Sequence, residues 1–261
     1  MCWRQDPVPR VNLARCSSWT SPVQRHLGPD HPATLTTRNH VASWTGKAGD
    51  GIEALRLFRE LLPDHERVLG PDHLDTLSTR NNIAAWTGEA GDATEALRLF
   101  RELLPYCERV LGPDHPASLT TRSNVAFWTG KAGDDTEALR LFRELLPDHE
   151  RVLGPDDPAT LNTRSNVAAW TGRAGDAPEA LRLFRELLPA CERVLGPDHP
   201  DTLSTRSNVA AWTGRAGDAT EALRLFRELL PDRERVLGPD HPDTLTVRSR
   251  ILYWAASPSN Q

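Results

Sequence analysis

The stretch 201–242, DTLSTRSNVAAWTGRAGDATEALRLFRELLPDRERVLGPDHP, decides the fold, because the chain repeats it with small changes along almost its whole length. Its GPD and WTG tripeptides both return with a period of 42 residues. The glycines of GPD are Gly28, Gly70, Gly112, Gly154, Gly196 and Gly238, and the tryptophans of WTG are Trp44, Trp86, Trp128, Trp170 and Trp212. A fixed period of this size is typical of a stacked repeat array, since one unit cannot bury its apolar face without its neighbours.

The first half of each unit predicts an amphipathic helix. On a wheel of about 100° per residue, one arc of residues 203–216 is small and polar, and the rest is mostly apolar with Arg206 as its only charge. The polar arc holds Ser204, Ser207, Asn208, Ala211 and Arg215, and the apolar arc holds Leu203, Thr205, Val209, Ala210, Trp212, Thr213 and Ala216. We expect the helix to begin near Pro200, which costs no internal hydrogen bond there, and to end at Gly217, where left-handed backbone favours glycine.

The second half predicts another helix, from Asp218 to a stop at Gly238 and Pro239. Asp218 and Glu221 have the spacing of a capping box, in which the aspartate accepts backbone N–H bonds and the glutamate reaches back to the cap. The same pair recurs in the other units. Apolar side chains then follow helical spacing, at Ala222, Leu223, Leu225, Phe226, Leu229, Leu230, Val236 and Leu237.

A proline stands in the middle of each predicted second helix, at Pro63, Pro105, Pro147, Pro189 and Pro231. Such a residue costs about 3 kcal/mol inside a helix, so the helix either breaks at the proline or continues with a kink. Leu229 and Val236 keep the same apolar phase on the two sides of Pro231. A break has no reason to preserve that phase, so the pattern favours the kinked helix.

Composition narrows the class of protein. The chain has 261 residues, of which 38% are hydrophobic and 26% charged, as in a globular protein with a continuous core. Its formal net charge of −5 gives no electrostatic reason to bind nucleic acid or an anionic membrane. No apolar run is long enough to span a membrane and residues 1–21 hold no signal-peptide core, so we expect a cytoplasmic protein. Cys107 and Cys191 lie two units apart and are expected to be free thiols.

Motifs for catalysis, cofactor binding and metal binding are missing from the sequence. It holds no GxxxxGK phosphate loop, HExxH zinc motif, GxSxG elbow or Gly-rich dinucleotide turn. One histidine per unit recurs in the DHP tripeptide, with Asp157 in the fourth copy, and this spacing cannot form a small metal site. Because aspartate replaces it in one copy, this histidine is expected to have a role in the turn. We therefore expect neither an enzyme nor a cofactor or metal.

The repeat also sets the expected domain limits. Residues 1–27 read as a degenerate N-terminal segment or cap, in which Trp3 and Trp19 could cover the first unit. Residues 28–256 form a single array of five helix pairs and a terminal helix, 243–256, and residues 257–261 are a short tail. First helices are expected to begin near Ala33, Asp75, Ala117, Ala159 and Asp201.

These features resemble the tetratricopeptide repeat in its 42-residue, kinesin-light-chain-like form, which is common in multidomain actinobacterial proteins. The resemblance covers roughly residues 27–256 and is carried by the turn glycine, acid, glutamate, alanine and aromatic at Gly217, Asp218, Glu221, Ala222 and Phe226. The chain departs from the family pattern at Arg206, Trp212, Gly214 and Pro231. The resemblance implies an all-α, right-handed superhelical solenoid of stacked antiparallel helix pairs, whose first helices line a concave, peptide-binding surface.

The family often places an asparagine on that surface to hold the backbone of a ligand. The matching positions are Asn82, Asn124, Asn166 and Asn208, whereas the first unit carries His40. Serines beside them, at Ser123, Ser165 and Ser207, leave room for an extended chain. An asparagine amide both donates and accepts, so such a ladder can satisfy a peptide backbone without reading its sequence. The alternatives are a solvated face or asparagines bonded to a neighbouring helix.

Charged residues of the first helices suggest two further roles. Lys131, Arg173 and Arg215 end the polar arc, and they either favour an acidic peptide or a C-terminal carboxylate or simply balance the helix dipole. Arginines in the apolar arc, at Arg38, Arg80, Arg122, Arg164, Arg206 and Arg248, need carboxylate partners, which the second helices can supply. The repeated tryptophans are expected to be core spacers.

The leading functional hypothesis is a scaffold that binds a protein or peptide on its concave face. Two alternatives remain open: self-assembly through the open terminal helix, with its apolar Ile251, Leu252 and Trp254, and a regulatory or sensor part of a larger signalling protein. The sequence leaves the oligomeric state open between a monomer and a weakly self-associating chain.

Overall fold

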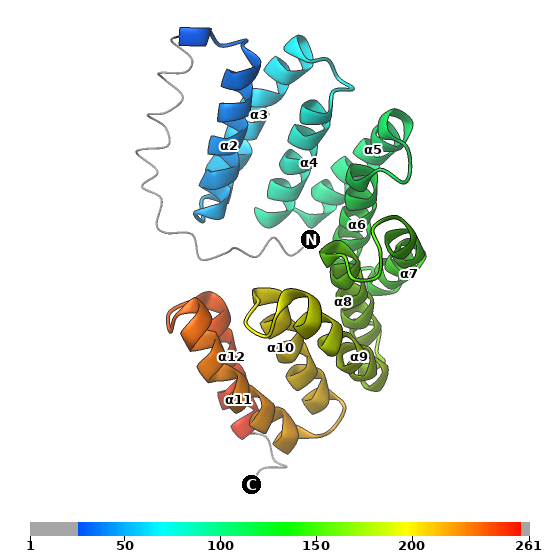
Figure 1. The fold of residues 1–261 in the computed structure, drawn as a ribbon, viewed down its shortest axis with the longest axis vertical. Helices are drawn as coiled ribbons and strands as arrows, with labels where there is room; N and C mark the ends of the chain where they lie inside the picture. The colour runs from blue at the N-terminus through cyan, green and yellow to red at the C-terminus, as the bar shows by residue number, and fades with distance from the viewer. Residues whose placement is uncertain (1–25, 257–261) are drawn as a thin grey trace. The chain divides into compact units, whose positions relative to one another are not determined.

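A computed structural model describes residues 26–256, in which eleven long helices are joined by short turns (Figure 1). The first helices of the repeats are α2 (Pro32–Lys47), α4 (Leu74–Glu89), α6 (Pro116–Lys131), α8 (Pro158–Arg173), α10 (Pro200–Arg215) and α12 (Pro242–Ala255). The second helices are α3 (Gly51–Val68), α5 (Ala93–Leu111), α7 (Asp135–Val152), α9 (Ala177–Leu195) and α11 (Ala219–Leu237). The expected N-terminal cap with Trp3 and Trp19, and the tail, lie outside the described residues.

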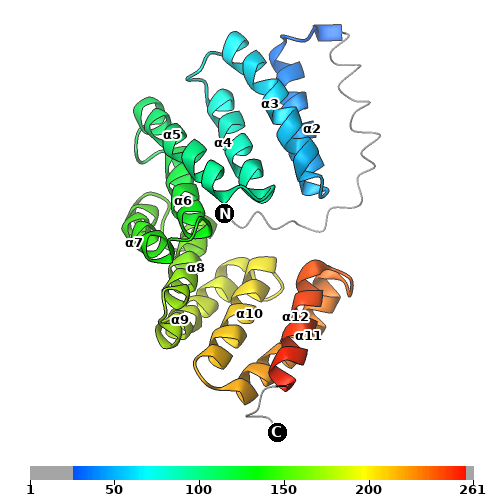
Figure 2. The ribbon, with the colours of Figure 1, turned by 180° about the vertical axis from the view of Figure 1, so that it is seen from behind.

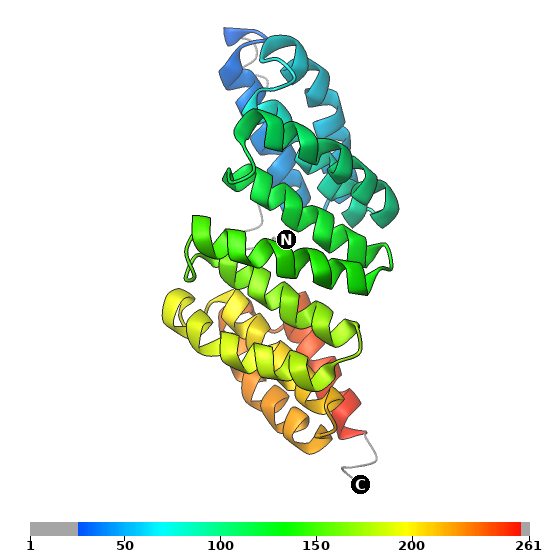
Figure 3. The ribbon, with the colours of Figure 1, turned by 90° about the vertical axis from the view of Figure 1, so that its right-hand side faces the viewer.

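The described residues form two compact units, 26–134 with α2 to α6 and 135–256 with α7 to α12. Within each unit every helix packs against the next along the chain, and α4 also contacts α6, as α8 contacts α10. Figures 2 and 3 show the neighbouring helices of each unit side by side. The expectation of an all-α stack of antiparallel helix pairs is therefore confirmed.

Local hydrogen bonds explain where each helix begins and ends. Nδ1 of His199 accepts the N–H of Asp201 at 3.2 Å, and Oδ1 of Asp157 takes the same role for Ala159 at 2.8 Å. The turn role expected for the DHP histidine is thus an N-cap. The first helix ends in a Schellman-type turn, in which Gly217 has a φ of +110° and the Asp218 N–H bonds the carbonyl of Thr213.

The capping box was only half right. Oδ1 of Asp218 accepts the Glu221 N–H at 2.9 Å, as expected, but the Glu221 carboxylate pairs with Arg224 at 2.6 Å instead of reaching back. The reason is that the Asp218 N–H is already bonded to the preceding helix through Thr213. The glutamate therefore serves an exposed ion pair on the helix surface.

Each second helix continues through its proline. Helix α5, for example, runs unbroken from Ala93 to Leu111 with Pro105 inside it. Leu103 and Cys107, on the two sides of Pro105, are both buried. The interpretation of two separate helices was therefore wrong, because one continuous helix keeps both buried positions in the core.

Within each unit the core passes from one helix to the next along the chain. The phenylalanine of every second helix is completely buried, at Phe58, Phe100, Phe142, Phe184 and Phe226. In the unit 135–256, Phe184 of α9 clusters with Ala168 of α8 and Trp212 of α10. Trp128, Trp170 and Trp212 are core residues as expected, whereas Trp86 is only partly buried and Trp44 in α2 is exposed.

The repeated first-helix arginines pair with second-helix carboxylates, as expected. Arg38 pairs with Asp64 at 2.6 Å, Arg164 with Glu150 at 2.6 Å and Arg206 with Asp232 at 2.7 Å. Their placement in the buried arc was wrong, however, because the side chains of these three arginines are 24–33% exposed. A long side chain with a charged end can leave the apolar arc and meet its partner at the edge of the core.

Candidate functional site

The predicted asparagine ladder is not uniform within the unit 26–134. Asn124 in α6 is 2% exposed, and its Nδ2 donates a 3.0 Å hydrogen bond to Oδ1 of Asn81 in α4. Asn82 and Ser123 are half-buried. In this unit one predicted ligand contact is therefore used to join neighbouring first helices, while Asn82 keeps part of its surface open to solvent.

In the unit 135–256 the corresponding amides are more accessible. Asn166 is half-buried, and its Nδ2 donates a 2.9 Å hydrogen bond to Asn162 one turn earlier in α8. Asn208, Ser165 and Ser207 are also half-buried. The first helices α8 and α10 thus present amide and hydroxyl groups with small neighbours along one face.

The three predicted cations are exposed and lie against aromatic rings of their own helices. Lys131 Nζ is 5.4 Å from the centroid of Phe127, and the guanidinium carbons of Arg173 and Arg215 are 4.3 and 4.5 Å from the Trp170 and Trp212 rings. Such contacts are worth about 0.5–1 kcal/mol at exposed sites. Arg173 also pairs with Asp135 at 2.9 Å, so part of its charge is neutralised within the protein.

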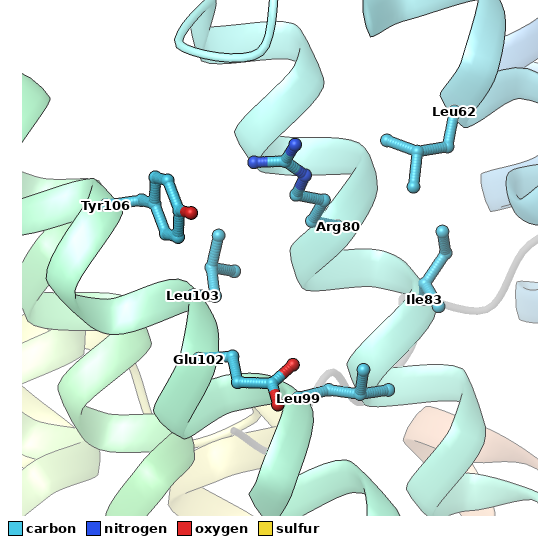
Figure 4. A pocket seen from close by; sticks show the side chains of 7 residues that line it. All are labelled: Leu62, Arg80, Ile83, Leu99, Glu102, Leu103 and Tyr106. Atoms are coloured by element: carbon cyan, nitrogen blue, oxygen red, sulfur yellow. The ribbon is translucent and has the colours of Figure 1, made fainter.

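Sequence reasoning missed a small pocket on the second-helix side of the unit 26–134. Its volume is about 260 Å³, and Figure 4 shows aliphatic side chains around it with Arg80, Glu102 and Tyr106 among them. It is lined by Leu62 of α3, Arg80 and Ile83 of α4, and Leu99, Glu102, Leu103 and Tyr106 of α5. The only signal in the sequence is Tyr106, which stands where three other units have aspartate.

The charges around this pocket are paired within the protein. Arg80 bonds Glu66 at 2.8 Å and lies 5.7 Å from the Tyr106 ring, and Glu102 pairs with Arg98. The pocket therefore offers mainly an apolar surface. Among the described residues, no cluster of histidine, cysteine, aspartate and glutamate could hold a metal ion, and none of the helices is long and apolar enough to cross a membrane.

The family assignment follows from a match that spans most of the chain. The family model described as tetratricopeptide repeat matches residues 34–107, 81–148, 119–192 and 165–233. The chain belongs to the tetratricopeptide repeat family. Repeats of this family generally mediate protein–protein interactions. No curated protein matches the sequence.

Solved structures share the fold of these tetratricopeptide repeats. BtubC (BKLC) from P. vanneervenii is 19% identical with a TM-score of 0.69, and the match covers 89% of this chain and 94% of that one. A putative kinesin light chain from Podospora anserina with nearly identical TPR-like repeats is 20% identical with a TM-score of 0.64, covering 79% and 98%. A Rap protein complexed with competence and sporulation factor is 12% identical with a TM-score of 0.67, covering 90% and 69%.

Proposed function

We propose that this protein binds extended segments of a partner protein on the first-helix face of each of its two units. The observation that carries the proposal is the set of half-buried amides at Asn82, Asn166 and Asn208. Each offers a donor and an acceptor to a peptide backbone, which needs both. The neighbouring Ala85, Ala169 and Ala211 are small and half-buried, and therefore leave space above the amides.

The buried Asn124 has a structural role. Its bond to Asn81 stabilises the contact between α4 and α6, so we exclude Asn124 from the proposed ligand contacts. Ser123, Ser165 and Ser207 remain candidates for hydroxyl contacts beside the amides, since all three are half-buried.

We further propose that the bound segment is acidic. Lys131 and Arg215 are exposed at the ends of α6 and α10, and each is held over an aromatic ring that fixes its direction. Arg173 is a weaker candidate because Asp135 already pairs with it. A carboxylate of the ligand would add a charge-assisted hydrogen bond to such a cation.

The test compares two triple variants on an array of random and acidic peptides. Asn82→Ala, Asn166→Ala and Asn208→Ala together should lower binding of the captured peptides at least tenfold while the helical circular dichroism signal is kept. The matched control changes the exposed second-helix residues Arg59, Arg143 and Arg185 to alanine, and it should bind like the parent. Equal binding by the asparagine variant and the parent would remove the ladder from the site.

A separate arm tests the charge of the ligand. Lys131→Gln combined with Arg215→Gln should weaken binding of acidic peptides and flatten its dependence on salt, because exposed ion pairs are screened. Peptides without acidic residues should be unaffected. If both peptide classes lose affinity equally, the cations do not select an acidic ligand.

Exposed apolar side chains at the end of α12 favour self-association as a second candidate function. Leu252 is 72% exposed, whereas the equivalent alanines of the five preceding first helices, Ala42, Ala84, Ala126, Ala168 and Ala210, are completely buried. Tyr253 and Leu245 are exposed beside it. An apolar patch of this kind can pack against a second copy of the chain. Leu252→Glu should abolish any concentration-dependent rise in mass by light scattering, and a parent that stays monomeric at all concentrations rejects this candidate.

A further inference from the structure

One buried position near the end of each second helix changes its residue along the chain. It holds His65, Cys107, His149, Cys191 and Arg233, all of which are buried. The next first helix packs a threonine against it, and in α12 the corresponding residue is Val247. Histidine and cysteine thus alternate at the junctions where a second helix meets the following first helix.

Hydrogen bonding fixes the state of the two histidines. Thr79 Oγ1 lies 2.8 Å from His65 Nδ1 and 2.9 Å from the carbonyl oxygen of Asp75. The single hydroxyl proton goes to that carbonyl, which can only accept, so His65 Nδ1 must be the donor to Thr79. His149 and Thr163 repeat this geometry at 2.8 Å, with the carbonyl of Ala159 at 3.0 Å. In both imidazoles Nδ1 carries the proton, and a second proton would have to enter at Nε2 inside the junction.

Burial and nearby charged groups change the pKa of His65 in opposite directions. Burial lowers the pKa of His65, and Arg38 of α2 and His73 before α4 act in the same direction. Asp75 of α4 acts against them. On α3 itself, Asp64 is bonded to Arg38 and Arg67, and Glu66 is bonded to Arg80 of α4.

The surroundings of His149 differ in two positions. Ala159 of α8 stands where α4 has Asp75, and Asp157 stands where His73 caps α4, so each junction has one carboxylate at these two positions. Glu150 and Asp148 of α7 are bonded to Arg164 and Arg151. The fifth unit shows how the protein accommodates a permanent cation at this position, since Arg233 reaches Asp243 of α12 at 3.4 Å and Ser204 at 3.2 Å.

We propose that acid opens the contact between a second helix and the next first helix at alternate positions, those of His65 with α4 and His149 with α8. The corresponding contacts of Cys107 and Cys191 stay closed. Protonation puts a charge into the interface between two repeats, and opening the interface releases that charge to water. The cysteine junctions have no such step, because burial raises the pKa of both Cys107 and Cys191 and the thiols stay neutral at and below pH 8. The device makes the packing of neighbouring repeats responsive to acid below the ordinary pKa of histidine, about 6.5.

The direction of the effect follows from linkage. A histidine whose pKa is lower in the folded than in the unfolded state takes up a proton on opening. Its contribution to stability is therefore full above its ordinary pKa, near 6.5, and is lost as the pH falls through the folded-state value.

Hydrogen exchange read by mass spectrometry tests the proposal within one molecule. Four segments are compared at pH 7.5 and 5.0 after correction for intrinsic rates: 65–79 and 149–163 with histidine, and 107–121 and 191–205 with cysteine. The opening of 65–79 and of 149–163, each relative to the two cysteine segments, should rise on the order of tenfold on acidification. An equal change in all four segments would overturn the proposal.

The same comparison distinguishes an effect of the capping histidines from an effect of the buried histidines. Segment 149–163 has Asp157 as its cap and His149 as its single histidine, whereas 107–121 and 191–205 carry the caps His115 and His199 and a buried cysteine. If acid acted through the caps, the cysteine segments would open and 149–163 would not, which contradicts the proposal.

The first variant introduces cysteine, which the chain already uses at this position in Cys107 and Cys191. His65→Cys with His149→Cys should remove the acid-dependent opening and leave exchange at pH 7.5 within twofold of the parent. His149→Asn, which keeps a neutral donor for Thr163, is the second variant should the double cysteine variant fold poorly. Acid-dependent opening that persists in either folded variant rejects the two histidines as its cause.

Discussion

The indole of Trp128 in α6 fills the space that a side chain on Gly88 in α4 would need. A Cβ atom added to Gly88 would lie 2.2 Å from Cη2 of Trp128, far inside van der Waals contact. The same relationship joins Trp86 to Gly46 in the unit 26–134, and Trp212 to Gly172 and Trp254 to Gly214 in the unit 135–256. The WTG tripeptide therefore supplies the glycine of all four contacts and the tryptophan of three, since Trp254 stands in a YWA sequence.

Gly88→Ala should destabilise the protein by about 1–3 kcal/mol, the usual cost of overpacking a core. The loss occurs although alanine is favoured over glycine inside a helix by about 1 kcal/mol. Urea unfolding of Gly88→Ala, Trp128→Ala and the double variant forms the test. In the Trp128→Ala background the same glycine substitution should be neutral or stabilising, because the ring is gone. A similar loss in both backgrounds would show that Trp128 is not the obstacle.

Pro105→Ala should raise the stability of the protein by about 1–3 kcal/mol. Pro105 is exposed and lies within the continuous helix α5, so its missing N–H leaves the carbonyl of Arg101 without the usual helical donor. Thermal unfolding measures the gain. The matched control is Pro116→Ala at the start of α6, where proline costs no hydrogen bond and the melting temperature should hardly move. A Pro105→Ala variant with the melting temperature of the parent contradicts the expectation.

Features that depend on neighbouring residues were predictable from the sequence. The limits of α10 and α11 followed from Pro200, Gly217, Asp218 and Gly238, because caps and left-handed turns are set within a few residues. The continuity of α11 followed from the apolar phase on both sides of Pro231. A single repeat therefore contains the information for its own helix pair.

Contacts between repeats were not predictable in the same way. A wheel drawn for one helix placed Asn124 on an open polar arc, but it gives no offset between adjacent first helices and so could not show Asn81 within bonding distance. It also placed Arg206 in the apolar arc, although the side chain reaches Asp232 at the edge of the core. The pocket beside Tyr106 needs side chains from three helices, and Tyr106 alone does not reveal the other two.

Arg193→Gln should raise the pKa of Asp156. The Arg193 guanidinium is bonded to both oxygens of Asp156, at 2.5 and 3.0 Å, and this hydrogen bonding lowers the pKa of that carboxyl from its ordinary value. The contribution to stability is present above the ordinary pKa of aspartate and is lost as the pH falls through the folded-state value. Carboxyl carbon NMR chemical shifts between pH 2 and 6 measure the change. Asp198, bonded to Arg235 in the same way, should titrate unchanged in this variant and serves as the control.

Asn81→Ala should cost about 1–3 kcal/mol, because it leaves the buried Nδ2 of Asn124 without the acceptor that now holds it. The neighbouring change Asn82→Ala removes a half-buried amide and should cost less, within about 0.5 kcal/mol of the parent. Urea unfolding compares the two, and the double variant Asn81→Ala with Asn124→Ala should recover part of the loss, since it removes the orphaned donor. The two single variants should behave oppositely in peptide binding, where Asn82→Ala weakens capture and Asn81→Ala, if folded, does not. Equal stabilities for the two single variants would mean that the Asn81–Asn124 bond does not hold α4 and α6 together, and Asn124 would then return to the proposed ligand contacts.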